Sequence, residues 1–307
     1  MFRVLLTNDD GILAPGLRAL AKQLGGWCDV TVVAPSRPRS ATSHSITLHK
    51  PLRLTRADDN CEEYAAESIA AYACSGTPSD CVMLGVLHLM NDTPPDLVIS
   101  GINDGMNVAE DLTYSGTVGG ALEGAIMGIP SIAASLTGSQ NIRFPEAAEV
   151  LDAVVCYLVY GVLRDELARH KRWLGQVKRP TERVKRGEED GGWVPAELSG
   201  QLCLNVNIPD LPPAELKGLL WTRAGNRTYE DIVRVSRDPN GREYYWLGGS
   251  KVLDREQPGS DTLAISTGYV SITPITYDIT QYSDLDRLKS WYTERYSGPG
   301  GHNRHGE

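Results

Sequence analysis

Short apolar runs alternate with amphipathic segments along the chain. Residues 3–6 and 29–35 have the length and composition of buried strands, and Leu17, Leu20 and Leu24 lie between them on one helical face. A strand, a helix and a strand in so short a span predict a βαβ unit with a parallel sheet, and so an α/β fold. The same patterns predict further strands at 45–54, 96–100, 131–135, 202–209 and 269–274, and further helices at 77–90, 145–162, 261–266 and 285–296.

The second half of the chain contains segments that depart from this alternation. Residues 229–238 and 242–247 flank Pro239-Asn240-Gly241, a hairpin turn, and the aromatic residues 244–246 favour a subunit contact or a pocket wall. Residues 164–200 are densely charged, which is typical of a solvated insertion; a phosphate-attracting arm is the alternative. Two polar stretches without periodicity are expected to form a loop and a disordered tail: residues 58–68 and 297–307.

The composition is that of an ordinary soluble globular protein, with 307 residues, 41% hydrophobic and 22% charged. The net charge of -9 argues against general binding to nucleic-acid polymers, which usually requires a basic surface. The six cysteines show no CxxC pair and no metal-ligand spacing, so we expect several of them to be small buried hydrophobic side chains. Neither a signal peptide nor a run of about 18 apolar residues is found, so the expected location is the cytoplasm, without a membrane partner.

Two adjacent carboxylates follow the first predicted strand. In Thr7-Asn8-Asp9-Asp10-Gly11, Asp9 and Asp10 lie on the turn between a strand and a helix, where ligands bind in open α/β sheets. Neighbouring ionised acids repel each other and resist burial, and a hard divalent cation such as Mg²⁺ or Mn²⁺ removes both problems. The alternative is a solvated turn, because Asn, Asp and Gly are common turn residues.

Other polar loops are expected at the same sheet edge. Residues 36–45 combine arginines, hydroxyls and a histidine after the second strand, and residues 101–107 form an Asn- and Asp-containing loop after another. An Asn carbonyl oxygen is a good neutral ligand for a hard cation. The turn at 114–121 opens a helix with small residues, whose unpaired backbone N–H groups form a ready anion site. The alternatives are a flexible surface loop at 36–45 and tight helix packing at 114–121.

Five ordered motifs resemble those of the survival protein E (SurE) family: TNDDG at 7–11, RSATSHSIT at 39–47, GTPSDC at 76–81, SGINDGMN at 100–107 and SGTV at 115–118. GYVSITP at 268–274 resembles the C-terminal strand of the family. The resemblance implies a Rossmann-like, three-layer core with a mainly parallel sheet, and a C-terminal β arm exchanged between subunits of a homodimer or homotetramer. The implied organisation is one domain over 1–296, with its core at about 1–160 and 200–228, the charged insertion at 164–200, and the arm and C-terminal helix at 229–296.

The resemblance also implies an activity and a set of site residues. Family members are metal-dependent phosphatases that hydrolyse nucleoside 5′- and 3′-monophosphates, and some shorten polyphosphate. Position by position, the resemblance implies one Mg²⁺ or Mn²⁺ per subunit held by Asp9, Asp10, Ser40 and Asn103, and a phosphate bound by Asn107, Ser115, Gly116 and Thr117. Ser43 stands where the family usually has glycine, so its side chain could narrow the site or shift the loop. The segment at 164–200 is longer than in typical members.

The predicted reaction is hydrolysis of a phosphomonoester by a metal-activated water. One of the two catalytic aspartates Asp9 and Asp10, with Asp9 the first candidate, could orient or deprotonate that water. His44 could protonate the leaving oxygen, although a histidine in a loop is more often structural. Two alternatives stay open. A phosphatase that forms an aspartyl-phosphate would need two acids spaced to one strand face, whereas Asp9 and Asp10 are adjacent. A non-catalytic nucleotide-binding regulator would rarely need two negative charges beside a phosphate.

Overall fold

The computed structural model describes residues 1–57, 61–138, 143–160, 202–255 and 257–296. The predicted insertion at 164–200 and the predicted tail at 297–307 lie outside the described residues. The chain divides into two compact units, one of residues 1–275 and one that begins at Thr276 and contains helix α9 (Tyr282–Tyr296). No helix in the described part of the chain is long and apolar enough to cross a membrane.

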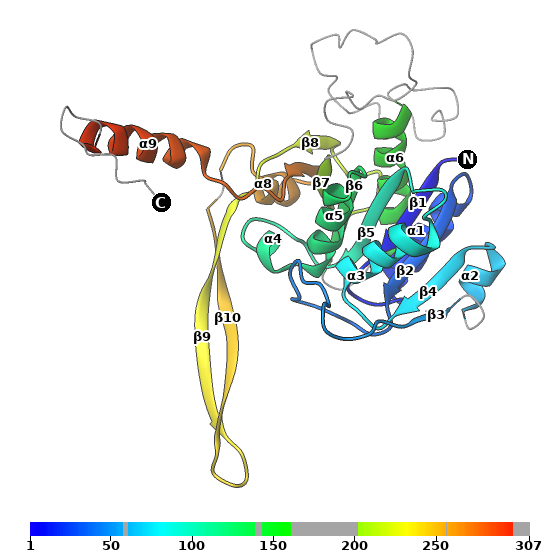
Figure 1. Cartoon of the computed structure of the whole chain (residues 1–307), viewed down its shortest axis with the longest axis horizontal. Coiled ribbons are helices and arrows are strands. Elements are labelled where there is room, and N and C mark those ends of the chain that lie inside the picture. Colours follow the sequence, from blue (N-terminus) through cyan, green and yellow to red (C-terminus); the bar gives the residue numbers. More distant parts are fainter. Residues whose placement is uncertain (58–60, 139–142, 161–201, 256, 297–307) are drawn as a thin grey trace, which may run out of the picture. The chain divides into compact units, whose positions relative to one another are not determined.

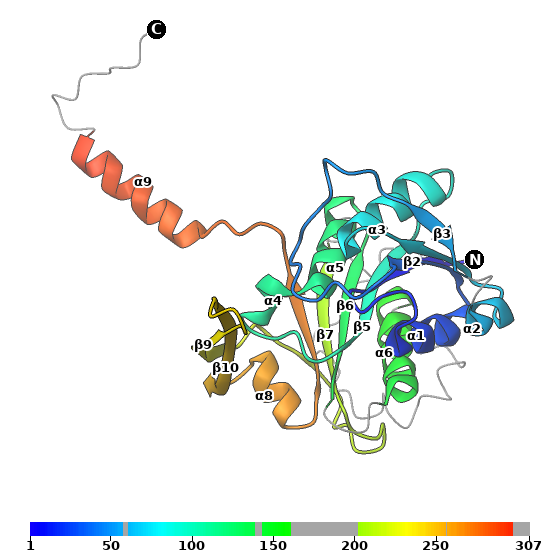
Figure 2. The ribbon, with the colours of Figure 1, turned by 90° about the horizontal axis from the view of Figure 1, so that it is seen from below.

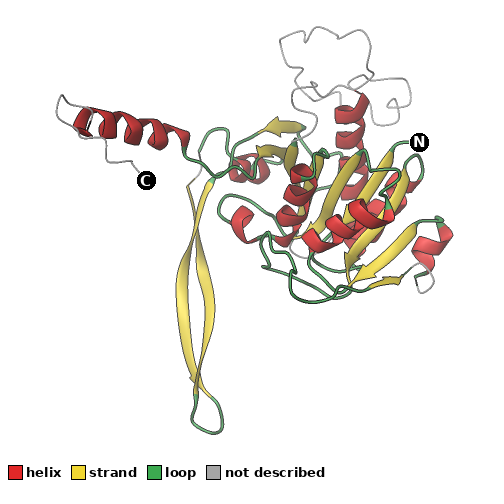
Figure 3. Cartoon of the chain, viewed as in Figure 1, coloured by secondary structure: helices red, strands yellow, loops and turns green. Residues whose placement is uncertain are grey.

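The first unit is built on one large sheet (Figures 1 and 3). Its strands are β1 (Arg3–Thr7), β2 (Asp29–Pro35), β3 (Leu54–Arg56), β4 (Ala70–Cys74), β5 (Leu97–Asp104), β6 (Ser131–Thr137), β7 (Cys203–Pro209), β8 (Leu219–Trp221) and β11 (Val270–Ile275). Their order is β3-β4-β2-β1-β5-β6-β7-β11-β8. The six neighbours from β4 to β7 are parallel, whereas β3 and β11 run antiparallel to β4 and β7. The predicted α/β fold with a mainly parallel sheet is confirmed.

Helices cover both faces of this sheet, which gives three layers (Figure 2). They are α1 (Pro15–Gly25), α2 (Glu62–Ala66), α3 (Pro78–Leu84) with the π-helical turn η2 (Gly85–Leu89), α4 (Asp111–Tyr114), α5 (Gly116–Ile126), α6 (Phe144–Tyr160) and α8 (Asp261–Ser266). Helices α1 and α6 pack together on one face, and α3 and α5 pack together on the other.

The apolar run of β1 shows how the sequence builds the two layers. Val4 and Leu6 point to the face covered by α1, where Leu17 is fully buried. Leu5 points to the opposite face and belongs to the buried cluster that contains Val82 of α3. A strand buried on both faces must be apolar at every position, whereas a strand with one wet face alternates. The continuous apolar runs in the sequence are therefore the signature of central parallel strands.

The order of the strands determines where a ligand can bind. From β1 the chain runs outward through β2 to β4, then returns to place β5 on the other side of β1. The carboxyl ends of parallel strands share one edge, and a crevice opens at this edge where the strand order reverses. That reversal lies between β1 and β5, directly beside the segments that contain Asp9 and Asn103.

Three local expectations failed between residues 45 and 74, near one side edge of the sheet. The strand predicted at 45–54 is wrong, because only Leu54–Arg56 is a strand, and 58–68 contains helix α2 rather than a continuous loop. The strand β4 was not predicted at all, since Ala70-Ala71-Tyr72-Ala73 contains no β-branched residue. Pairing with β2 on one side and β3 on the other holds this segment extended.

The predicted hairpin is present and is longer than expected. Strands β9 (Asn226–Arg237) and β10 (Glu243–Arg255) form a separate two-stranded sheet, seen in Figure 3 as a long ribbon. At the turn, the Asp238 carboxylate accepts hydrogen bonds from the backbone N–H groups of Asn240 and Arg242, at 2.8 and 2.9 Å. That this hairpin contributes to oligomerisation stays a prediction.

Candidate functional site

In the turn after β1, the residues that close the turn are not the two aspartates. The Asn8 side chain exchanges two 3.1 Å hydrogen bonds with the backbone of Gly11 and closes the loop. Gly11 has φ +101°, a conformation that side chains other than glycine rarely adopt. Asn8 and Gly11 therefore make the turn, so turn chemistry alone does not account for Asp9 and Asp10 between them.

The two aspartates are held at the sheet edge with little access to water. Asp9 is 5% exposed, and burial raises the pKa of its carboxyl, although hydrogen bonds from Thr117 and from the amides of Gly116 and Thr117 oppose the rise. Burial, followed by repulsion from Asp9, raises the pKa of Asp10 to about 6. Among the described residues no Lys, Arg or His nitrogen lies within 4.0 Å of either carboxylate. A bound cation would stabilise both ionised carboxylates and so offset the effects of burial and of their mutual repulsion.

The other predicted metal ligands come from segments that touch this pair. The backbone N–H of Asp104, next to Asn103, donates to Asp10 Oδ2 at 3.3 Å. The backbone N–H of Arg39, next to Ser40, donates to the Asp9 carbonyl oxygen at 2.7 Å. The two loops thus meet the aspartates from either side, although no hydrogen bond joins the Ser40 or Asn103 side chain to them in the part of the chain that the structure describes.

The donor set decides what kind of ion could fit here. The described residues contain no cluster of three or more His, Cys, Asp or Glu side chains suited to a metal. Two carboxylates, supplemented by hydroxyl, amide and water oxygens, match the preference of Mg²⁺ or Mn²⁺ and not that of Zn²⁺, which favours nitrogen and sulfur. The residues present therefore fit a hard divalent cation.

The start of α5 lies directly against Asp9. Thr117 Oγ1 donates to Asp9 Oδ1 at 2.5 Å, and Ser115 caps the helix by accepting from the backbone N–H of Val118. A Cβ added to Gly116 would lie 2.8 Å from Thr42 Oγ1 and 3.0 Å from Asp9 Oδ2, so a larger residue would displace these side chains. The structure thus brings the predicted phosphate-binding turn and the first predicted metal ligand together.

Asn107 occupies a different polar cluster, centred on β6 and β7. Its side-chain amide donates to Ser135 at 2.8 Å, its backbone N–H donates to Asn207, and its carbonyl oxygen accepts from both Asn205 and Asn207. Among the described residues no hydrogen bond joins Asn107 to the start of α5. Sequence reasoning missed Asn205 and Asn207, although polar residues at alternate positions of the otherwise apolar strand Cys203–Pro209 were a usable signal.

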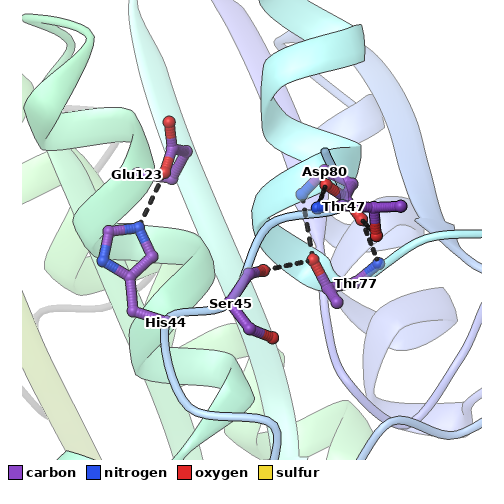
Figure 4. A network of polar contacts seen from close by, with 6 residues as sticks. All are labelled: His44, Ser45, Thr47, Thr77, Asp80 and Glu123. Atoms are coloured by element: carbon purple, nitrogen blue, oxygen red, sulfur yellow. Dashed lines mark hydrogen bonds and ion pairs between the residues drawn. The ribbon is translucent and has the colours of Figure 1, made fainter. Parts of the chain in front are cut away.

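Residues 44–47 of the polar loop after β2 are held by hydrogen bonds to α3 and α5 (Figure 4). His44 Nε2 lies 2.7 Å from Glu123 Oε2, and Thr47 donates through its backbone N–H and its hydroxyl to the Asp80 carboxylate. Thr77 donates to the carbonyl oxygen of Ser45 at 2.6 Å. Residues 36–45 form a surface loop, and these bonds attach its C-terminal end to α3 and α5. The partners Glu123 and Asp80 were not predicted, because nothing local links them to the loop.

Ser43, the departure from the family pattern, takes part in the same fixation. Its backbone has φ +54°, which explains why glycine suits this position. Its hydroxyl donates to the Thr113 carbonyl oxygen at 2.7 Å, and its N–H donates to the Tyr114 carbonyl oxygen at 3.0 Å. The side chain therefore points to α4 and binds there.

A family model described as survival protein SurE matches residues 4–231 of the chain. The chain belongs to the SurE family. The protein named 5′-nucleotidase SurE from Moorella thermoacetica is 42% identical over 298 residues, which cover 97% of this chain and 98% of that one. The one from Synechococcus sp. is 41% identical over 290 residues, covering 94% and 96%. The crystal structure of the SurE protein from Aquifex aeolicus matches with a TM-score of 0.68 and 36% identity, over 94% of this chain and 99% of that one.

Proposed function

We propose that this SurE-family protein is a metal-dependent phosphomonoesterase that hydrolyses nucleoside 5′-monophosphates, with 3′-monophosphates and short polyphosphate as further substrates. The names of its relatives support the nucleotidase activity. The observation that carries the proposal is the pair of half-buried to buried carboxylates, without a basic partner among the described residues, next to the start of a helix. A carboxylate pair repels phosphate unless a cation lies between them.

In this proposal Asp9, Asp10, Ser40 and Asn103 hold one Mg²⁺ or Mn²⁺. When bound, the cation would polarise a phosphoryl oxygen and lower the pKa of a coordinated water. The pKa of about 6 at Asp10 means that a cation competes with a proton for this carboxylate in weakly acidic solution.

The residues of the chain supply orientation and charge stabilisation. Thr117 occupies Asp9 Oδ1, so Oδ2 is the oxygen that can orient the attacking water or accept its proton. The positive end of the helix dipole at the start of α5 stabilises the non-bridging phosphoryl oxygens as charge develops, while the backbone N–H groups of Gly116 and Thr117 hold the Asp9 carboxylate beside it. Ser115 holds this first turn in place through its cap.

The test is phosphate release from a panel of nucleoside 5′- and 3′-monophosphates and tripolyphosphate, with Mg²⁺, Mn²⁺ or EDTA. We expect EDTA to abolish phosphate release. Asp9→Ala and Asp10→Ala should lower kcat/KM by more than about a hundredfold, because mutating residues that only support a metal ligand typically lowers activity about 10–100-fold. Asp92→Ala, at an exposed turn, is the matched control. Near-normal rates for either variant at saturating Mn²⁺ would contradict the assignment, and an acid-stable phosphorylated Asp would favour the aspartyl-phosphate mechanism instead.

We also infer that the β9–β10 hairpin is a subunit contact in a homodimer or homotetramer. Val233 and Val235 are more than half exposed, as are Tyr245 and Trp246 of the opposite strand. Such apolar exposure on a two-stranded sheet is costly for a monomer. Sedimentation equilibrium of the wild type and of Val235→Lys/Trp246→Lys tests this. A wild-type monomer at micromolar concentration would exclude the contact.

A further inference from the structure

The loop of residues 39–47 lies along one face of helix α5. Gly116, Gly119 and Glu123 are spaced by three and four residues, so they share this face. A Cβ added to Gly119 would meet the Ser43 carbonyl oxygen at 2.7 Å and His44 Cα at 3.0 Å. The loop backbone therefore touches the helix backbone, and Glu123 is the first side chain along this face that can reach the loop.

Glu123 is a buried carboxylate, 8% exposed, in a helix otherwise made of small and apolar residues. A buried carboxylate is costly unless it accepts hydrogen bonds or pairs with a cation. Its partner is His44, whose Nε2 lies 2.7 Å from Glu123 Oε2 and whose side chain is 28% exposed. In Figure 4 the other ring nitrogen, Nδ1, lies on the side of the ring turned away from Glu123.

The bond to Glu123 differs from the other attachments of the loop. Asp80 receives the Thr47 N–H and hydroxyl, but it also completes the capping box of α3 with Thr77, so it serves the helix as well as the loop. Glu123 lies in the interior of α5, where no cap is needed. Its recorded hydrogen bond goes to a side chain that can exchange protons, in the loop that also contains Ser40.

We propose that Glu123 is a positioning residue for this site, acting through His44. Since an ionised carboxylate only accepts, a neutral imidazole bonded to it through Nε2 has its proton on Nε2, which leaves Nδ1 as the ring nitrogen that can accept from a ligand. Glu123 thereby fixes both the tautomer of His44 and the seat of the loop on α5. The part that concerns turnover rests on the proposed function; the tautomer does not.

A double-mutant cycle separates this role from a purely structural one. We expect Glu123→Ala and His44→Ala each to lower kcat for a nucleoside monophosphate by about ten- to a hundredfold, and the double variant to be no slower than the slower single variant within about threefold. Glu123→Gln keeps an acceptor oxygen and should restore most of the activity lost in Glu123→Ala. Glu149→Ala, at an exposed position of α6, is the matched control.

Histidine-selective ¹⁵N NMR provides a readout that needs no activity, with the His44 signals assigned by their loss in His44→Ala. We expect the Nε2-protonated pattern in the wild type and a mixture of tautomers in Glu123→Ala. Losses that multiply in the double variant, an unchanged rate in Glu123→Ala, or the same tautomer pattern in both proteins would overturn the proposal. A wild type that releases no phosphate would refute the proposed function. The tautomer pattern would still decide whether Glu123 positions His44. Circular dichroism checks that each variant folds. If Glu123→Ala does not fold, the same rate and tautomer measurements are made on the nearly isosteric Glu123→Gln.

Discussion

Asp10→Asn tests the electrostatic description of the site, because it removes one charge and almost no volume. Burial and the neighbouring Asp9 raise the pKa of the Asp10 carboxyl to about 6. A raised folded-state pKa means that the protonated acid stabilises the fold, and this stabilisation is complete below the ordinary pKa of 3.8 and is lost as the pH rises through about 6. The Asn variant resembles the protonated acid at every pH.

The size of the effect follows from the two pKa values. A rise from 3.8 to about 6 corresponds to about 3 kcal/mol against the ionised form, at about 1.4 kcal/mol per pH unit. Because the Asp10 side chain is partly exposed, solvent screening reduces this to roughly 1.5 kcal/mol. Above pH 6 and without divalent cations, Asp10→Asn should therefore be more stable than the wild type by about 1.5 kcal/mol, which is about 3–6 °C in Tm for a domain of this size.

The assay is urea unfolding followed by tryptophan fluorescence, in EDTA, between pH 4 and pH 8. We expect the stability difference to shrink as the pH falls toward 4 and to reach its plateau above pH 6. Saturating Mn²⁺ should reverse the order, because an ion at 100 times its Kd stabilises the wild type by about 2.7 kcal/mol. Asp92→Asn, at an exposed turn, is the control and should show neither effect.

The reasoning is refuted if Asp10→Asn in EDTA at pH 8 is less stable than the wild type. It is also refuted if the difference is the same at pH 4 and pH 8, since a change in packing, unlike a change in ionisation, does not depend on pH in this range.

Three further substitutions test contacts around Asp9 and the loop. Thr117→Val removes the donor to buried Asp9, so we expect a loss of about 1.5–3 kcal/mol in urea unfolding together with slower phosphate release; unchanged stability would show that this bond contributes nothing. Gly116→Ala places a Cβ 3.0 Å from the Asp9 carboxylate and should lower kcat/KM more than about tenfold, whereas Gly248→Ala, with nothing within 4 Å, should not; equal effects would contradict the close approach. Ser43→Gly relieves a backbone at φ +54° but loses a hydrogen bond, so its stability should stay within about 1 kcal/mol of the wild type. A larger loss of stability would show that the Ser43 hydroxyl is the main attachment of the loop.

Much of the site could be predicted because its parts are local. The adjacent Asp9 and Asp10 after an apolar run, and the Thr77, Pro78 and Asp80 that open α3, are patterns within a few residues of one another. The irregular course of 45–53 could not be predicted in this way, because its hydrogen bonds reach residues 22 to 33 positions away.

By itself, the sequence determined the α/β class, the central buried strands and the residues that end them, since each depends on short-range periodicity and on turn or cap chemistry. Only the tertiary structure decided which strand ends meet, that β1 lies between β2 and β5, and that Glu123 and Asn207 hold the loops from a distance. The physical reason is that a buried polar group must find a partner, but the partner can come from any segment that the packed layers bring within hydrogen-bonding distance.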